Sequence, residues 1–511
     1  MKRYRFRVAL LVLAGFVFAY AVGFSALSLR RYDVFHATTF DLGIIAQVTW
    51  NTAHGRWFET SIDRATNTEL IGSYLGNHVR PILLVLAPFY LLWRDPRLLL
   101  VVQSLALGLA AFPLFSIAHK QTEDRKAALI VAGCYLAYPA LGFLNLADFH
   151  PIALSIPLLF VACWALQEGR MPLFWGAVLL ALSTKEEMVA PIGMWGVVKL
   201  LERQKRGVAM GLLALSGVWA VLSFGLVIPR FNEGESYRFW QLWSHLPFFP
   251  SQGVSSEGTV QVIGSGSART IALFLIHLFL PLGFLPVLGY GSFAVALPSL
   301  AYLLLGQRPA FHSVGYQYPA VLIPWFFLAV VEGLRRLRRR IGPPVRSRPY
   351  RMGLAFVVIG TLGTNVPLNP VFLYAREGVF QPDPYHEQIE EALAHIPAQA
   401  GVATINRFGP QLANRCVLVA LEYPAPFRLD HVEMADYVLL DLVDCRMVPA
   451  QDKRARYAEI VTEVLETEWY GVRYWQDRIL LLERGAPSQE SIGAVSNYVD
   501  RLVEQDRPCW P

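Results

Sequence analysis

Long apolar runs separated by short polar turns fill the chain up to about residue 375. Eleven of them have the composition of helices that cross a bilayer, for which roughly 20 apolar residues are needed. These runs are Val8–Leu29, Leu98–Ala118, Ala127–Leu146, Pro151–Leu166, Pro172–Thr184, Met188–Leu201, Val208–Ile228, Thr270–Leu288, Ser292–Leu305, Tyr316–Leu334 and Met352–Phe372. Because several are short, the pattern predicts about eleven membrane-spanning helices, within a range of ten to twelve. A twelfth run, Pro81–Trp93, is too short to cross and is typical of a juxtamembrane or re-entrant helix.

After Tyr374 the pattern changes to short alternating segments. It predicts strands at Gly401–Ile405, Cys416–Leu421 and Tyr437–Asp441, helices at Gln388–His395 and Asp452–Thr467, and a hairpin edge or final strand at Tyr474–Glu483. We therefore expect an all-α multi-spanning membrane domain over residues 1–375, whose outward loop 30–97 carries juxtamembrane helices, and a soluble α/β domain over residues 376–511. The polar segment Arg407–Arg415 follows a predicted strand, where it contacts either a ligand or the membrane domain.

Composition agrees with a membrane protein. The chain is 54% hydrophobic and 16% charged, and its mean hydropathy is +0.38. The net charge of +6 comes largely from Lys and Arg gathered in a few loops, so it indicates topology and not a nucleic-acid partner. The first segment has a basic start, but its apolar run is too long for a signal peptide, so we expect an uncleaved anchor.

Basic residues also predict which loops face the cytoplasm. The N-terminus and the loops 119–126, 202–206 and 335–351 are rich in Lys or Arg, and all four fall on one side if Pro81–Trp93 does not cross. The N-terminus is then cytoplasmic and the C-terminal domain extracytoplasmic. In that oxidising compartment Cys416 and Cys445 could form a disulfide or remain free; the five cysteines have no metal-binding spacing.

Most of the polar and ionisable residues that lie between apolar segments fall on the predicted outward side. Ionisable groups beside apolar helices are costly, and they often mark a functional site. The candidates are Asp41, His78, Arg80, Asp148, His150, Lys185, Glu186, Glu187, His312 and Tyr316. Simpler explanations exist for some of them: Asp41 and His150 could cap helices, and Lys185 could pair with Glu186 or Glu187.

Three of these residue types suggest a particular chemistry. Asp41 can act as a base or a metal ligand, His78 as a metal ligand, and Arg80 as a clamp for phosphate. An acid, an imidazole and a guanidinium at the edge of a bilayer indicate a lipid-linked substrate that carries phosphate.

Several motifs along nearly the whole chain resemble a known family. They are Phe40-Asp41-Leu42-Gly43, Trp50-Asn51-Thr52, His54-Gly55, His78 with Pro81, Asp148-Phe149-His150-Pro151, Lys185-Glu186 and Ala435-Asp436-Tyr437-Val438-Leu439-Leu440-Asp441. They look like the bacterial membrane proteins of domain of unknown function 2079. That family is in turn similar to the GT-C superfamily of integral-membrane glycosyltransferases, which includes protein O-mannosyltransferases and aminoarabinose transferases. The resemblance implies a GT-C-like fold in the bacterial plasma (inner) membrane.

The resemblance also implies site residues. Asp41 matches the catalytic acid of the first outward loop. His78-Val79-Arg80-Pro81 lies where aminoarabinose transferases have an acid that binds metal and a base that meets phosphate, and Lys185 lies at their Thr-Lys-Gly turn. The stretch His312–Pro319 resembles their tyrosine-proline segment. His78 and Glu186 depart from the pattern, since they stand where those enzymes have an acid and a glycine.

Together these observations predict an inverting glycosyltransferase that takes sugar from a polyprenyl-phosphate donor on the extracytoplasmic face. Asp41 would be the general base, while Arg80 and Lys185 would bind the donor phosphate. His78, with Asp41, would hold a divalent metal ion, or it would hydrogen-bond the phosphate instead. The competing hypotheses are a transporter or flippase of a lipid-linked or anionic substrate, and a non-catalytic membrane scaffold. The sequence does not indicate the sugar, the acceptor or the oligomeric state.

Overall fold

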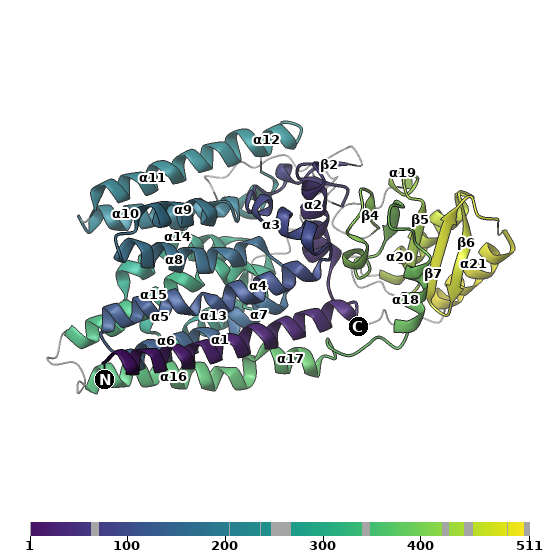
Figure 1. Ribbon diagram of the computed structural model, residues 1–511. Coiled ribbons are helices and arrows are strands. Elements are labelled where there is room, and N and C mark those ends of the chain that lie inside the picture. Colours follow the sequence, from purple (N-terminus) through teal and green to yellow (C-terminus); the bar gives the residue numbers. More distant parts are fainter. Residues whose placement is uncertain are drawn as a thin grey trace.

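The computed structural model describes residues 2–62, 71–203, 205–235, 237–246, 267–339, 348–421, 429–443, 453–487 and 489–504. Its larger part is a bundle of long, roughly parallel helices, and a smaller α/β domain lies at one end of that bundle (Figure 1). The bundle helices are α1 (Lys2–Asp33), α4 (Arg97–Leu109), α5 (Ala111–Thr122), α6 (Arg125–Leu136), α7 (Pro139–Leu146), α8 (Ser155–Gln167), α9 (Met171–Leu182), α10 (Val189–Leu201), α11 (Arg206–Ala220), α12 (Ile228–Phe231), α13 (Ala268–Phe279), α14 (Tyr290–Leu305), α15 (Ile323–Arg339), α16 (Arg348–Leu368) and α17 (Pro370–Arg376). Each of the eleven apolar runs is helical over most of its length.

The number of membrane-spanning helices is not confirmed at about eleven. In the described residues, four helices are long and apolar enough to cross a membrane: Phe6–Asp33, Arg97–Thr122, Arg206–Phe231 and Arg348–Arg376. A fifth is reached if α6 and α7, bent by 42° at their junction, form one span. The other apolar helices are shorter because turns and prolines interrupt them. For example, the run Thr270–Leu288 divides at Pro281 and Pro286 into α13 and two 3-10 turns, Leu280–Leu282 and Leu285–Leu288.

The basic connections gather at the end of the bundle that lies away from the α/β domain (Figure 1). There Arg338 pairs with Glu123, Tyr350 donates to Asp124 at 3.2 Å, and Lys205 Nζ donates to the Leu166 carbonyl at 2.8 Å. These contacts bring the α5–α6, α8–α9, α10–α11 and α15–α16 connections together. The sidedness that we infer from their charge, with this end in the cytoplasm, stays a prediction.

The described residues of the segment 30–97, namely 30–62 and 71–97, form a layer between the bundle and the α/β domain (Figure 1). The layer contains the π-helical turn η1 (Thr39–Gly43), α2 (Ile44–Ala53), the short strands β1 (Glu59–Thr60) and β2 (Gly72–Ser73), the 3-10 turn η2 (Tyr74–Gly76) and α3 (Ile82–Leu92). The run predicted to be juxtamembrane or re-entrant is thus the short helix α3, which packs on α2.

The C-terminal domain is built on a five-stranded sheet of order β4-β3-β5-β7-β6. The elements are α18 (His386–Ala394), β3 (Val402–Thr404), β4 (Leu418–Ala420), α19 (Leu429–Val432), β5 (Tyr437–Asp441), α20 (Lys453–Glu466), β6 (Tyr470–Gln476), β7 (Ile479–Arg484) and α21 (Gln489–Glu504). β3 is parallel to β4 and to β5, while β7 is antiparallel to β5 and β6. The predicted strands and helices are therefore present, and the last segment is a hairpin. The division at residue 375 stays a prediction, as does the Cys416–Cys445 pairing, because Cys445 lies outside the described residues.

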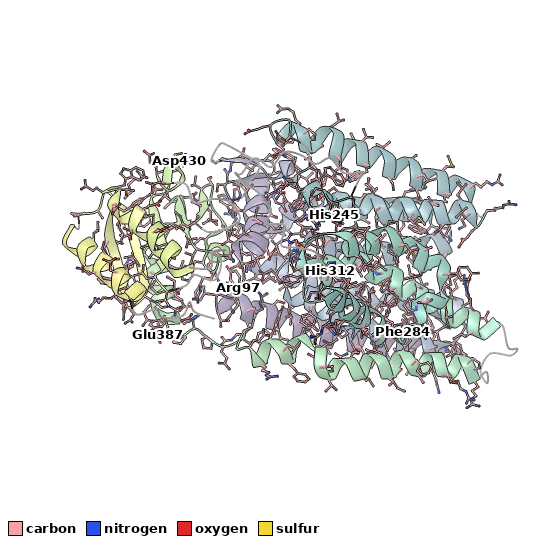
Figure 2. All side chains as sticks on the ribbon, turned by 180° about the vertical axis from the view of Figure 1, so that it is seen from behind. Arg97, His245, Phe284, His312, Glu387 and Asp430 are labelled. Atoms are coloured by element: carbon pink, nitrogen blue, oxygen red, sulfur yellow. The ribbon has the colours of Figure 1, made fainter. Side chains whose placement is uncertain are left out.

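The α/β domain shares a hydrophobic core with the 30–97 layer. Leu42 and Ile45 of the layer belong to the same buried cluster as Phe408, Leu412 and Leu418 of the domain. Figure 2 shows Arg97 where bundle and domain meet, Glu387 and Asp430 on the domain, and Phe284 further along the bundle. Buried apolar side chains thus hold the layer and the α/β domain together.

Candidate functional site

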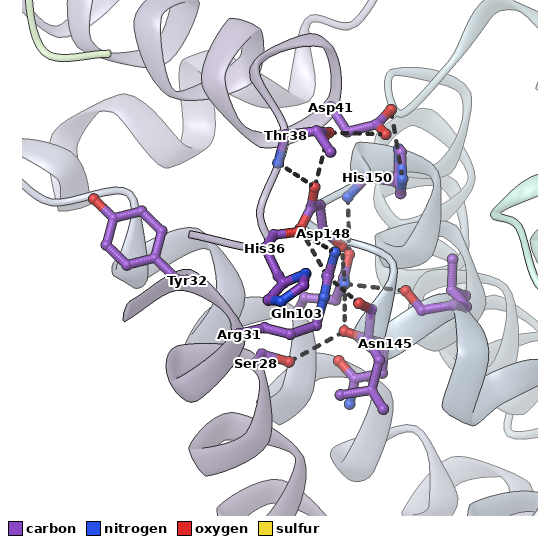
Figure 3. Close-up of polar contacts among 12 residues, drawn as sticks. Ser28, Arg31, Tyr32, His36, Thr38, Asp41, Gln103, Asn145, Asp148 and His150 are labelled. Atoms are coloured by element: carbon purple, nitrogen blue, oxygen red, sulfur yellow. Dashed lines mark hydrogen bonds and ion pairs between the residues drawn. The ribbon is translucent and has the colours of Figure 1, made fainter. Parts of the chain in front are cut away.

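Asp41 lies in η1, in the layer between the bundle and the α/β domain. Its Oδ2 accepts a hydrogen bond from Thr38 Oγ1 at 3.2 Å, and its Oδ1 lies 3.9 Å from His150 Nε2 (Figure 3). Forty-four per cent of the side chain remains exposed. Burial raises the pKa of Asp41 above its ordinary value, while the Thr38 hydrogen bond and the guanidinium groups of Arg308, Arg31 and Arg80 act in the opposite direction. The carboxylate therefore lies among protein groups but remains accessible to a substrate, as a general base must be.

Asp148 has a different environment although it lies nearby. It is only 3% exposed, and its carboxylate pairs with Arg31 Nη1 at 2.8 Å and accepts bonds from Thr38 N at 2.9 Å and Thr38 Oγ1 at 3.0 Å (Figure 3). Its φ of 64° is in the left-handed region, which is uncommon for aspartate. With its oxygens used in this way, Asp148 serves to hold the Thr38 turn beside Asp41.

His150 begins the 3-10 turn Pro151–Leu154 that leads into α8. Its backbone N donates to Gln103 Oε1 at 2.9 Å, and Gln103 Nε2 donates to the Asp148 carbonyl at 2.7 Å. His150 Nε2 is buried and has no hydrogen-bond partner in the described part of the chain. Gln103 therefore fixes the backbone that aims this imidazole at Asp41.

A second group of polar residues centres on Glu186, which is fully buried. Glu186 Oε1 lies 2.8 Å from His78 Nδ1 and accepts a bond from the Tyr237 hydroxyl at 2.7 Å, and its Oε2 accepts from Val79 N at 3.0 Å. Burial foremost, together with the nearby Arg80, lowers the pKa of His78 to about 3. Burial alone would raise the pKa of Glu186. The interactions of its carboxylate with His78, Lys185 and Arg80 outweigh that effect and hold the pKa below its ordinary value. A neutral imidazole thus donates to an ionised carboxylate.

Lys185 is paired within its own turn. Its Nζ lies 2.8 Å from Glu187 Oε2, and the other oxygen of Glu187 accepts from the Tyr302 hydroxyl at 3.2 Å. Lys185 is 7% exposed, and its ammonium lies 6.0 Å from the ring centre of Tyr318. The simpler explanation from sequence, a local Lys–Glu pair, therefore describes Lys185 in this structure. A role for it in binding phosphate stays a prediction.

Two arginines lack such acidic partners in the described residues. Arg80 is 9% exposed, its guanidinium lies 5.5 Å from the ring centre of Tyr74, and its Nε is buried without a hydrogen-bond partner there. Arg308 precedes the 3-10 turn Pro309–His312, and its guanidinium lies 5.4 Å from the ring centre of Tyr318. Both lie close enough to Asp41 to influence its pKa, and Arg80 also influences the pKa of His78. Neither guanidinium forms an ion pair in the described residues, so both are placed to contact an anion bound beside Asp41.

The remaining candidates differ in exposure. His312 is buried, with Nε2 3.3 Å from the Leu304 carbonyl and Nδ1 without a partner in the described residues. Tyr316 is 50% exposed, and its ring lies 6.4 Å from that of Tyr318. Neither has a described contact with Asp41, so both stay candidates only.

The geometry gives little support for a metal ion held by Asp41 and His78. No group of three or more His, Cys, Asp or Glu side chains in the described ranges is arranged to hold a metal. His78 Nδ1 is engaged by Glu186, and its ring stacks on Phe239 at 5.1 Å. The metal-binding role predicted for Asp41 and His78 therefore stays a prediction.

Sequence reasoning missed several residues of this region: Arg31, Thr38, Gln103, Tyr237, Tyr302, Arg308 and Tyr318. Their partners lie far away in the sequence; Arg31 and Asp148, for example, are 117 positions apart. Only for Arg308 does the sequence offer an indication of a role in the site, because it lies in the outward loop just before the tyrosine-proline stretch.

Comparison with solved structures identifies the class of fold. Over 91% of this chain and 98% of the other, the structure is similar to that of ArnT from Cupriavidus metallidurans bound to undecaprenyl phosphate, with a TM-score of 0.51 and 12% identity. The apo state of ArnT from the same organism gives a TM-score of 0.47 and 13% identity over 91% and 97% of the two chains. At this identity the likeness establishes the fold and nothing finer.

The chain itself belongs to the family of predicted membrane proteins called DUF2079, whose model matches residues 31–481. A search of curated proteins gives no match. The family that the motifs suggested is thereby confirmed.

Proposed function

We propose that the protein is a GT-C-type glycosyltransferase that uses a polyprenyl-phosphate-linked sugar on the extracytoplasmic face of the bacterial inner membrane. The observation that carries this proposal is Arg80. A buried guanidinium is costly without a counter-charge, and Arg80 has no ion-pair partner in the described residues. An anionic group of the substrate would supply that charge next to Asp41. The ArnT structure, which holds undecaprenyl phosphate, suggests a lipid phosphate as the anion.

The proposed step is a single displacement. The acceptor hydroxyl attacks the anomeric carbon of the sugar, the bond from that carbon to the phosphate oxygen breaks, and polyprenyl phosphate leaves with the electron pair. Asp41 takes the proton of the attacking hydroxyl as general base. Arg80 and Arg308 offset the charge that grows on the leaving phosphate. Lys185 would act beside them, but its pairing with Glu187 makes it a weaker candidate than Arg80.

Asp41→Asn tests the proposal directly. General-base catalysis typically contributes on the order of 10²–10⁴-fold, so transfer should fall by at least about 10²-fold. Release of undecaprenyl phosphate from a panel of undecaprenyl-phosphate sugars, in the presence of a membrane extract as acceptor, measures the rate. Because burial raises the pKa of Asp41, the wild-type rate should decline on the acid side at a pH above the ordinary aspartate value of 3.8.

The control is Asp33→Asn, which changes an aspartate of the same loop that is 41% exposed and paired with Arg97. An exposed pair of this kind contributes about 0–1 kcal/mol, so the control should stay active. If Asp41→Asn retains full activity, or fails to accumulate in the membrane, Asp41 is a structural cap and not the base. If substrate crosses the bilayer without any transfer, the protein is a transporter.

A further inference from the structure

The segment that follows β3 contacts the turn that carries Asp41. Asn406 directs two oxygens at that turn. Its carbonyl accepts bonds from Thr39 N at 2.8 Å and Thr39 Oγ1 at 2.6 Å, and its side-chain Oδ1 accepts from Thr39 N at 3.0 Å and Phe40 N at 3.4 Å. A residue of the α/β domain thus binds the first backbone N–H groups of η1, across 367 positions of sequence.

These bonds have a structural reason. The first N–H groups of a helix have no partner within the helix, and a side chain just before it usually accepts from them. Thr38 occupies that place, but its hydroxyl bonds Asp41 and Asp148 and does not cap the turn. Asn406 supplies the missing acceptor from the other domain, which leaves Thr38 available to orient the carboxylate of Asp41.

Close packing fixes the same contact. A Cβ added at Gly409 would lie 2.0 Å from Thr39 Oγ1 and 2.8 Å from Thr39 Cβ, so a side chain there would force the turn and the segment apart. Pro410 N lies 3.5 Å from the place where a Cβ at Gly43 would be, at the other end of η1. Both ends of the five-residue turn are therefore seated on the α/β domain.

We infer that Asn406 is a positioning residue for Asp41: the α/β domain caps the turn η1 and thereby places the carboxylate for catalysis. This inference rests on the proposed function for its catalytic meaning, although the capping itself does not depend on it. A base works only within hydrogen-bond reach of the proton that it removes, and a misplacement of about 1 Å can cost on the order of 10²-fold in rate.

The experiment compares Asn406→Ala with Asn414→Ala in the full-length protein. Asn414 also bridges the two parts of the molecule, since it accepts from the Tyr90 hydroxyl at 2.8 Å and donates to the Arg94 carbonyl at 2.8 Å, but among the described residues it makes no hydrogen bond to η1. Both variants therefore lose an asparagine that joins the two parts of the molecule, and only Asn406→Ala also loses hydrogen bonds to the turn that carries Asp41. In Asn406→Ala the backbone carbonyl keeps its two bonds to Thr39, so the variant should fold.

Two readouts are needed. Hydrogen exchange of the peptide that contains Thr39 and Phe40 reports on the cap without any substrate. We expect faster exchange in Asn406→Ala, wild-type exchange in Asn414→Ala, and restored protection in Asn406→Asp, because aspartate caps a helix about as well as asparagine. In the transfer assay, kcat of Asn406→Ala should fall by about 10- to 100-fold at unchanged KM, while Asn414→Ala stays near wild type.

The outcomes separate this inference from the proposed function. Unchanged exchange in Asn406→Ala overturns the inference, as does faster exchange with an unchanged kcat. Equal effects in both variants also overturn it, because the contact would then serve only to hold the domains together. If the wild type transfers no sugar to any acceptor, the proposed function fails, and the exchange data alone decide whether Asn406 caps the turn.

Discussion

At the scale of single residues, the cations near Asp41 differ mainly in whether they form a close ion pair. Lys185 has Glu187 at 2.8 Å, and Arg31 has Asp148 at the same distance. Arg80 is buried with no ion pair in the described residues. On the proposed function, Arg80 is therefore the cation most able to contact a bound phosphate.

Arg80→Ala should therefore weaken binding of undecaprenyl phosphate by about 1.5–3 kcal/mol, the range for hydrogen bonds to charged groups, and leave the melting temperature nearly unchanged. Lys185→Ala should mainly lower the melting temperature, because it leaves Glu187 without its ion-pair partner, and it should weaken binding less than Arg80→Ala does. Lipid binding and thermal unfolding, measured on the same purified variants, distinguish the two.

Arg56→Ala is the matched control, since Arg56 also lies over an aromatic ring of the same layer, that of Trp50 at 4.9 Å, but it hydrogen-bonds Asn51 at 2.9 Å. Equal losses of binding in Arg56→Ala and Arg80→Ala would argue that only overall charge matters. A loss of stability without a loss of binding in Arg80→Ala would remove Arg80 from the site.

At the scale of elements, Glu186 ties three separate segments together. His78 and Val79 precede α3, Tyr237 precedes the 3-10 turn Arg238–Trp243, and Glu186 itself begins the 3-10 turn Glu186–Met188. None of these segments is a long helix with its own hydrogen-bond ladder. Their mutual placement depends on this one carboxylate and its three donors.

We expect acid to loosen this contact. An unfolded chain protonates histidine near pH 6.5, whereas burial holds His78 neutral until about pH 3. Protons then bind the unfolded state preferentially, so stability should be greatest above pH 6.5 and should fall as the pH is lowered toward 3. Glu186 acts in the same direction: its pKa is lowered on folding, so its contribution is present above 4.5 and is lost in acid.

Thermal unfolding between pH 7 and pH 4 measures the effect, and His78→Gln is the informative variant. Glutamine can still donate to Glu186 but does not titrate, so the melting temperature of His78→Gln should fall less steeply with acid. Parallel curves for the two proteins would show that other groups govern the acid response.

Elements that depend on local pattern could be predicted, and contacts between distant segments could not. The strand Tyr437–Asp441 is predicted with its observed bounds because a short continuous apolar run is a local signal. The pairing of Lys185 with Glu187 was foreseen as an alternative because two positions separate them. The hydrogen bond between Glu186 and His78 joins residues 108 positions apart, and that between Asn406 and Thr39 joins residues 367 positions apart. The residue types alone do not indicate which distant residue each of them will contact.

At the scale of the whole molecule, the charge pattern predicts that the two ends of the bundle face opposite sides of the membrane. The basic connections meet at one end, and the layer 30–97 and the α/β domain lie at the other. A site built at the second end would have access to lipid-linked donors on the outer face only if the basic end faces the cytoplasm.

Reporter fusions check this arrangement. Alkaline phosphatase should be active when fused after Leu480 and inactive when fused within the loop 335–351, and a cytoplasmic reporter such as green fluorescent protein should give the opposite pattern. An inactive phosphatase after Leu480 would contradict the topology and would place Asp41 on the wrong side of the membrane.

The cap on the Asp41 turn has a consequence for how the protein is made. A ribosome that has completed Thr39 must add 367 further residues before Asn406 exists, and on the predicted topology that residue must then be exported and seated on the layer. Until then the chain carries Asp41 on an uncapped turn. On the proposed function, a nascent chain, or one shortened by a premature stop or a protease before β3, would be inserted in the membrane yet inert. Activity would begin only when synthesis and export are complete, which would protect the cell's limited pool of lipid carrier from unfinished enzyme.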